Sequence, residues 1–135
     1  MKSAVAEQMQ ERSSGLETGL RQHLLLGRWI NTNPSPAFLL GIQLRPRRNG
    51  LLMQVTAAEP GLPPHWGEIE AEPFAESPAS GEAMALSAVF HLDGVDVRLQ
   101  GYVVKGVLVI ISFACVKDGR DRFSHFCKEF FYRVP

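Results

Sequence analysis

Gly27-Arg28-Trp29-Ile30-Asn31 is the stretch of this chain that decides its fold. It is followed by about seven further short runs in which apolar and polar residues alternate, a pattern typical of β-strands that bury one face. A tryptophan that opens the first of these strands predicts a closed barrel, with the indole filling one end.

The strands are separated by residues that favour turns. We expect eight strands, over residues 25–31, 38–45, 51–57, 65–74, 83–92, 95–104, 107–116 and 122–133. Asn49-Gly50, Asp93-Gly94 and Lys105-Gly106 are typical of tight hairpin turns, because such residues accept positive φ angles. No connection is long enough for a crossover helix, so the strands are expected to be antiparallel. The sequence therefore predicts an all-β, up-and-down barrel, which has no exposed edge.

A single domain is expected from the length. The chain has 135 residues, of which 45% are hydrophobic, and this suffices for one sizeable core. Residues 1–14 carry no strong pattern and are predicted to form a flexible N-terminal tail. The barrel domain is predicted over residues 15–135.

A short helix is expected between the tail and the first strand. Leucines recur at helical spacing from Leu16 to Leu26. Ser14 and Glu17 precede and open this run with the residue types of a capping box. The pattern predicts an α-helix from Leu16 to Leu26 that ends at Gly27.

The charge balance argues against two classes of partner. Fourteen basic and 14 acidic residues give a formal net charge of zero, so no global field attracts nucleic acid or an anionic membrane. No apolar run approaches the roughly 20 residues that span a bilayer, and the N-terminus lacks the apolar core of a signal peptide. We therefore expect a cytoplasmic protein without nucleic-acid or membrane partners.

No metal or other cofactor is expected. The histidines are scattered and the cysteines fit no metal motif, and motifs for phosphate binding or a nucleophile elbow are missing from the sequence. The cysteines, Cys115 and Cys127, fall on neighbouring predicted strands. We expect free, buried thiols, with a cross-strand disulfide as the alternative.

The Gly-x-Trp at residues 27–29 resembles the start of the first strand in the calycin superfamily, which comprises lipocalins, fatty-acid-binding proteins and avidins. In lipocalins an arginine from the end of the last strand lies across this indole. The resemblance implies that Arg133 stacks on Trp29. Trp29 would then be structural, and direct contact with a ligand is the alternative.

The chain also resembles avidins at both ends. Avidins show Gly-x-Trp-x-Asn with a serine four residues later, and Gly-x-Asp-x-Phe near the C-terminus. Asn31, Ser35 and Asp121 occupy the matching positions here, and in avidins these residue types bind the polar groups of biotin. Avidins surround biotin with several tryptophans, whereas this chain has Trp66 alone besides Trp29. The resemblance therefore implies polar ligand contacts at one end of the barrel, with a ligand other than biotin.

The last predicted strand has two mixed faces, and the alternation does not decide which of them points inward. One face carries Phe123, His125, Cys127, Glu129, Phe131 and Arg133; the other carries Ser124, Phe126, Lys128, Phe130 and Tyr132. If the first face is interior, His125 and Glu129 stand in a polar column that suits general acid–base catalysis. An exterior face or a hydrogen-bonded core pair is the alternative. Tyr132 is a further candidate for ligand contact.

Trp66 enters the fourth predicted strand directly after a proline-rich break. A tryptophan at the rim of a barrel can contact a ligand, contact a second subunit or simply pack, and the sequence leaves these alternatives open.

Three functions are compatible with these features. We expect first an intracellular barrel that binds a small hydrophobic molecule in its interior. One alternative is a cyclase or isomerase without metal or nucleotide cofactor, acting on a polyketide-like substrate of natural product biosynthesis through His125 and Glu129. The other is a homodimeric interaction module in which Phe130 and Tyr132 face outward.

Overall fold

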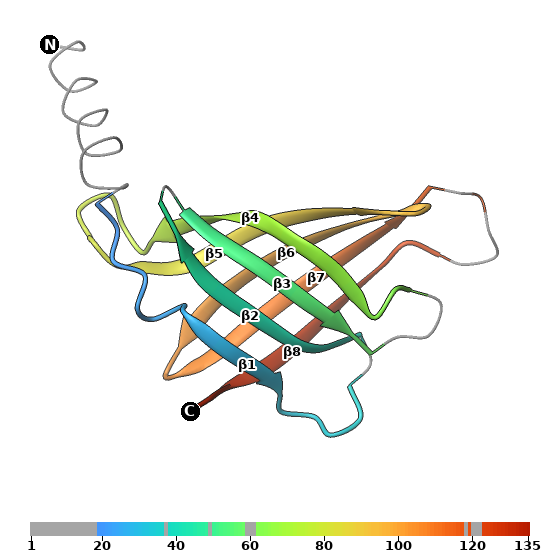
Figure 1. Cartoon of the computed structure of the whole chain (residues 1–135), viewed down its shortest axis with the longest axis horizontal. Helices are drawn as coiled ribbons and strands as arrows, with labels where there is room; N and C mark the ends of the chain where they lie inside the picture. Colours follow the sequence, from blue (N-terminus) through green and yellow to red (C-terminus); the bar gives the residue numbers. More distant parts are fainter. Residues whose placement is uncertain (1–18, 37, 49, 59–61, 118, 120–122) are drawn as a thin grey trace, which may run out of the picture.

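The computed structural model describes residues 19–36, 38–48, 50–58, 62–117, 119 and 123–135, and these form a closed barrel (Figure 1). Each of the eight antiparallel strands pairs with the next one in the chain, and the last pairs with the first. The strands are β1 (Gly27–Asn31), β2 (Leu39–Arg47), β3 (Gly50–Ala57), β4 (His65–Ala75), β5 (Ala83–Leu92), β6 (Val95–Val104), β7 (Val107–Val116) and β8 (His125–Val134). The predicted all-β fold and up-and-down order are confirmed.

The strands with the most accurately predicted bounds are those joined by tight hairpins. β5, β6 and β7 begin and end at the predicted residues. In the β6–β7 turn, Lys105 has a φ of 51° and Gly106 a φ of 77°, as a two-residue turn of this kind requires. β1 starts later than predicted, at Gly27, because the residues before it belong to a turn.

The predicted N-terminal helix is wrong for the part that the structure describes. Residues 16–18, like the predicted tail over 1–14, lie outside the described residues. From residue 19 to residue 26 the chain forms no helix and crosses one end of the barrel (Figure 1). The amide of Arg21 donates to the carbonyl of Gly81 over 2.7 Å, and the amide of Ala83 donates to the carbonyl of Arg21 over 2.8 Å. Local bonds are limited to one turn, in which the amides of Leu25 and Leu26 donate to the carbonyl of Gln22, and the segment is otherwise held by tertiary bonds. Leu25 is buried in the barrel.

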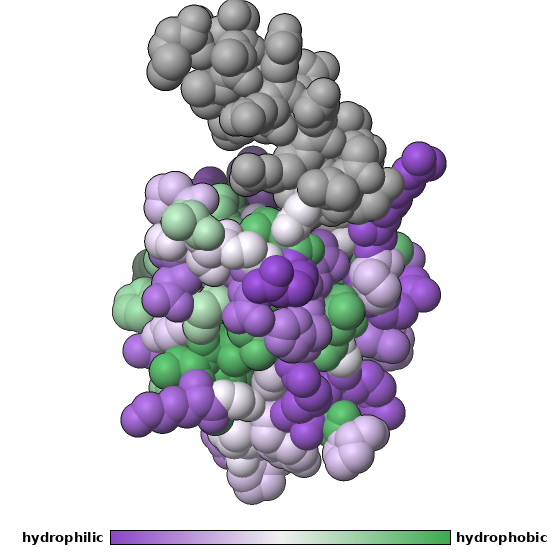
Figure 2. Space-filling model, turned by 90° about the vertical axis from the view of Figure 1, so that its left-hand side faces the viewer, coloured by the Kyte–Doolittle hydropathy of each residue, from purple (hydrophilic) through white to green (hydrophobic). Residues whose placement is uncertain are grey.

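We call this the N-terminal end, and we call the opposite one, where the β1–β2, β3–β4, β5–β6 and β7–β8 connections lie, the loop end. At the N-terminal end, the Nε1 of Trp29 donates to the carbonyl of Leu25 over 2.9 Å. The guanidinium of Arg133 lies 4.6 Å from the centre of the indole and donates to the carbonyls of His23 and Leu24. The implied stacking of Arg133 on Trp29 is therefore confirmed. Figure 2 looks onto this end, and the part not covered by grey atoms is filled by side chains.

β4 changes the face that it turns inward. Trp66 and Ala71 are both buried, although they are five positions apart and would face opposite sides of a regular strand. The change occurs at Gly67, which has a φ of 81° beside an irregularity in the β3–β4 register. A bulge of this kind needs the freedom of glycine. As a result Trp66 points inward while the following glutamates of the strand face water.

Large side chains fill the interior of the barrel. Those without appreciable accessible surface include Trp29, Met53, Phe90, Leu99, Ile110 and Phe131. Gly101 lies among them on β6, and a Cβ there would stand 2.5 Å from the Cδ1 of Ile110. Gly101 therefore provides the space that Ile110 fills. No membrane-spanning helix occurs within the described residues.

This close contact makes Gly101→Ala a test of the packing. Overfilling a tight core costs about 1–3 kcal/mol, so we expect that loss in the free energy of unfolding measured by urea denaturation. Gln100→Ala, on the outer face next to it, should stay within about 0.5 kcal/mol of wild type. Adding Ile110→Val to Gly101→Ala should recover part of the loss, and strictly additive effects of the two changes would contradict this account.

Candidate functional site

Strand β8 turns the face with the functional groups inward. Glu129 is 7% exposed and Phe131 is fully buried, whereas Lys128, Phe130 and Tyr132 face solvent. The sequence left open which face of this strand points inward, and the structure shows that it is the face with Glu129 and Phe131. The interior-facing pairs of β7 and β8, in order from the N-terminal end to the loop end, are Leu108–Phe131, Ile110–Glu129, Ser112–Cys127 and Ala114–His125.

The interior becomes accessible towards the loop end. Cys127 is partly exposed although it belongs to the inward face of β8. Leu62, Leu92 and Val116, which pack against the core, are also only partly buried. The side chains in the middle of the barrel have almost no accessible surface. The inward side chains near the loop end are therefore more accessible than those in the middle of the barrel.

Aromatic rings gather at this place, and we call Phe38, Trp66 and Phe90 the aromatic cluster. The ring centres of Phe38 and Trp66 are 5.7 Å apart and those of Trp66 and Phe90 are 5.3 Å apart, each pair with planes inclined by 65°. The Nε1 of Trp66 donates to the carbonyl of Pro63 over 2.9 Å. Edge-to-face pairs of this kind stabilise by about 0.5–1.5 kcal/mol each. The cluster is therefore a group of apolar rings, because the one polar atom in it, the Nε1 of Trp66, is already bonded to Pro63.

Glu129 fastens the β1–β2 connection to β8. Its carboxylate accepts from the amide of Phe38 over 3.2 Å, from the amide of Leu39 over 3.1 Å and from the Nδ2 of Asn31 over 3.1 Å. Asn31 also donates to the carbonyl of Leu39 over 2.8 Å, and its Oδ1 accepts from the amide of Asn33. These bonds satisfy both buried groups, so the geometry gives Glu129 and Asn31 a positioning role for Phe38.

The structure does not bring His125 and Glu129 into contact. They stand four residues apart on one strand, which corresponds to about 13 Å. His125 lies exposed at the rim, where its Nδ1 is 3.1 Å from the carbonyl of Phe123. Its ring centre is 5.7 Å from that of Phe38, and Phe38 thus contacts both members of the predicted column.

The other predicted ligand contacts are dispersed. Ser35 is exposed in the connection after β1, and its amide donates to the Oδ1 of Asn33 over 3.0 Å. Tyr132 lies on the outer face of β8, and Trp29 belongs to the closed N-terminal end. Asp121 lies outside the described residues. Of the groups nominated by the avidin resemblance, the interior therefore holds Asn31.

Sequence reasoning missed Phe38, Phe90 and Ser112. Ser112 is 2% exposed, and its hydroxyl has no hydrogen-bond partner among the described residues. Its signal was the single hydroxyl in the apolar run of β7, in alternation with Leu108 and Ile110. No feature of the sequence predicted the contacts of Phe38 and Phe90 with Trp66, because these contacts form only when the barrel closes.

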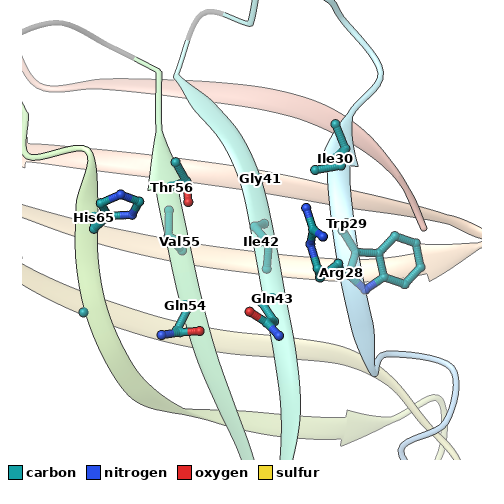
Figure 3. A pocket seen from close by; sticks show the side chains of 11 residues that line it. Arg28, Trp29, Ile30, Gly41, Ile42, Gln43, Gln54, Val55, Thr56 and His65 are labelled. Carbon is teal, nitrogen blue, oxygen red and sulfur yellow. The ribbon is translucent and has the colours of Figure 1, made fainter. Parts of the chain in front are cut away.

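A hollow of about 380 Å³ lies on the outer face of β1, β2, β3 and β4 (Figure 3). Gly41 and Gly67 contribute to its lining without side chains. Its polar side chains are Arg28, Gln43, Gln54, Thr56 and His65. Because it lies outside the barrel, this hollow differs from the interior site that the sequence predicts.

The described residues contain no group of three or more histidine, cysteine, aspartate or glutamate side chains that could hold a metal ion. Cys115 and Cys127 are free thiols, as expected. The expectation that both are buried is wrong: Cys115 is exposed on the outer face of β7, and Cys127 is only half-buried.

A charged cluster lies on the outer face at the β5–β6 turn, where His91 is exposed and the preceding Phe90 is buried. Hydrogen bonds from Lys117 and then from His91 hold the pKa of Asp96 below its ordinary value, and the same contact raises the pKa of Lys117. The Nδ1 of His91 lies 2.9 Å from Asp96. These exposed charges link the two turns that follow β5 and β7.

Comparison with known proteins gives no relative from which a role could be transferred: no family model matches the chain, and no curated protein or solved structure matches it.

The bonds of Glu129 predict the effect of Glu129→Ala. Removing the carboxylate leaves the amides of Phe38 and Leu39 and the Asn31 side chain without this acceptor. An unpaired buried group costs about 1–3 kcal/mol, so we expect a loss of about 3 kcal/mol or more in urea denaturation. The Phe38 and Leu39 amides should also exchange hydrogen faster. Glu72→Ala, on the outer face of β4, is the control, and an equal loss in both variants would show that Glu129 does not fasten this connection.

Proposed function

We propose that this protein binds a small, mainly hydrophobic molecule at the loop end of its barrel, in contact with the aromatic cluster. The observation that carries the proposal is the cluster itself. Its rings are buried, and the inward side chains near them at the loop end, Leu62, Leu92 and Val116, are only partly buried. Apolar and aromatic walls with few polar groups are typical of small-molecule sites.

The difference between the two ends of the barrel supports entry of the ligand from the loop end. Residues 19–26, Trp29 and Arg133 close the N-terminal end through hydrogen bonds and ring stacking. At the loop end the rings of the cluster contact one another. A flat apolar ligand can form ring contacts of the same kind with them. Since the middle of the barrel is packed, we propose a ligand that is small.

The coarse architecture also supports a proposal about kinship. The closed eight-stranded antiparallel barrel, with Trp29 beneath Arg133, shares the arrangement that calycins show, and we propose that the chain belongs to that superfamily. Its two free thiols favour the reducing conditions of the cytoplasm as its location.

A neutral fluorescent probe, N-phenyl-1-naphthylamine, tests the binding proposal. We expect a saturable rise of its emission with the wild-type protein. Trp66→Leu removes a ring of the cluster and should weaken binding about tenfold, which corresponds to ~1.4 kcal/mol. Phe74→Leu replaces an exposed aromatic residue of the same strand and should leave the affinity unchanged. Absence of saturable binding to wild type, or an equal loss in both variants, would refute the proposal.

A second candidate function is homodimerisation through the outer face of β6, β7 and β8. We call Tyr102, Phe113, Phe126, Phe130 and Tyr132 the outer aromatic face. Phe126 is 69% exposed, Phe130 44% and Tyr132 50%, so the outward orientation on which this alternative depends is present. The rings of Phe113 and Phe126 are stacked at 6.1 Å.

The size of the outer aromatic face fits a partial interface. Tyr102 is 40% exposed and Phe113 39%. With about 200 Å² for each aromatic side chain, the exposed fractions of all five correspond to roughly 500 Å² of accessible surface. A stable interface needs about 800 Å² from each partner, and Val104, Ile111 and Lys128 extend the same face. Lys128 lies 5.8 Å from the ring of Phe130, so the face combines cations with rings, and two copies can offer these groups to each other.

Sedimentation velocity tests this candidate. We expect the wild-type chain to sediment with the mass of two copies at tens of micromolar, and Phe126→Asp to sediment as a monomer. Leu40→Asp changes an equally apolar, exposed residue on β2 and should remain dimeric. A wild-type protein that stays monomeric at the highest concentration would remove the candidate.

A further inference from the structure

We infer that Ser112 is the polar anchor of the bound molecule, so that the ligand carries a neutral carbonyl group and enters the barrel with that end first. The inference rests on the proposed binding at the loop end and adds the chemical class of the ligand and its orientation.

The first observation is the state of the hydroxyl. Ser112 is 2% exposed, and its Oγ makes no hydrogen bond to any described residue. The other buried polar side chains of the described part, Asn31 and Glu129, are both hydrogen-bonded. Burying a hydroxyl without a partner destabilises a fold. Ser112 therefore has an unused donor and acceptor in an interior that otherwise pairs its polar groups.

The second observation is the place of Ser112 relative to the aromatic cluster. It pairs across the strands with Leu99 on β6 and with Cys127 on β8. The next pair towards the loop end is Ala114–His125, about 7 Å further along the strands, and the ring of His125 contacts Phe38. A molecule that touches the cluster and extends one pair deeper therefore meets Ser112.

Neighbouring side chains cover the hydroxyl on the side of the loop end. Packing covers Ser112 in this structure, so a ligand has to displace its neighbours. Cys127, directly across the strands, is partly accessible, and it marks the side from which the displacement starts.

The surroundings select the chemistry of the ligand. Glu129 faces the interior in the pair next to Ser112 towards the N-terminal end, and no lysine or arginine is among the buried side chains of the described part. An anionic ligand group would therefore be repelled and left without a counter-ion. A carbonyl oxygen only accepts hydrogen bonds, so the Ser112 hydroxyl satisfies it, whereas a ligand hydroxyl would bring a further donor into the interior.

Two probes of nearly the same shape test the inference: 2-acetylnaphthalene, and 2-isopropenylnaphthalene, in which a methylene group replaces the carbonyl oxygen. Their affinities are measured by displacement of N-phenyl-1-naphthylamine. We expect the wild-type protein to bind the ketone at least fivefold more tightly than the alkene. Ser112→Ala should bind both probes equally, with the affinity for the alkene unchanged. Ser87→Ala, on the outer face of β5, should keep the wild-type preference.

Thermal unfolding without ligand provides a second readout. Because Ser112→Ala removes an unpaired hydroxyl, its Tm should equal or exceed that of wild type, whereas a structurally bonded serine would make it fall. If neither probe binds to the wild-type protein, the proposed function itself is refuted. If both bind with equal affinity to wild type, binding at the loop end stands and the anchor is overturned. A lowered Tm of Ser112→Ala together with a retained ketone preference would also overturn it.

Discussion

The carboxylate of Glu129 is the group on which the arrangement of the loop end depends. The irregular chain between β1 and β2 presents the amides of Phe38 and Leu39 to an interior that is otherwise apolar, and Glu129 accepts from both and from Asn31. β8 is thereby tied to the connection that leads from its neighbour β1 to β2, where the barrel closes. Phe38, held in this way, contacts Trp66 and His125. Glu129, which the sequence suggests as a candidate catalytic residue, thus has a structural role, because the position of Phe38 in the aromatic cluster depends on its bonds.

Much of the architecture could be predicted, because local chemistry determines it. Alternation and the turns at Asp93-Gly94 and Lys105-Gly106 define β5, β6 and β7 to the residue. The stacking of Arg133 on Trp29 followed from a resemblance rather than from the pattern, and the structure confirms it. Alternation failed to orient β8, because an outer face that carries Phe126, Phe130 and Tyr132 looks as apolar as an inner one.

The remaining features depend on tertiary contacts that a pattern does not contain. Leucine spacing before Gly27 resembled a helix, but from residue 19 to residue 26 the chain bonds to the segment around Gly81 and covers the barrel end. Trp66 faces inward because of a bulge at Gly67, so its orientation could not be read from the strand that follows. The cluster unites residues from the β1–β2 connection, β4 and β5, and Ser112 becomes notable only when its neighbours leave the hydroxyl without a partner.

Binding at the loop end can be followed residue by residue in an amide chemical-shift titration of the isotope-labelled protein with 2-acetylnaphthalene. We expect saturable shifts at the amides of Phe38, Trp66, Phe90 and Ser112, with the amides of β1 near Trp29 unchanged. Shifts that are largest at Gln43 and Gln54 in the outer hollow, or at Phe126 and Phe130 on the outer aromatic face, would contradict it.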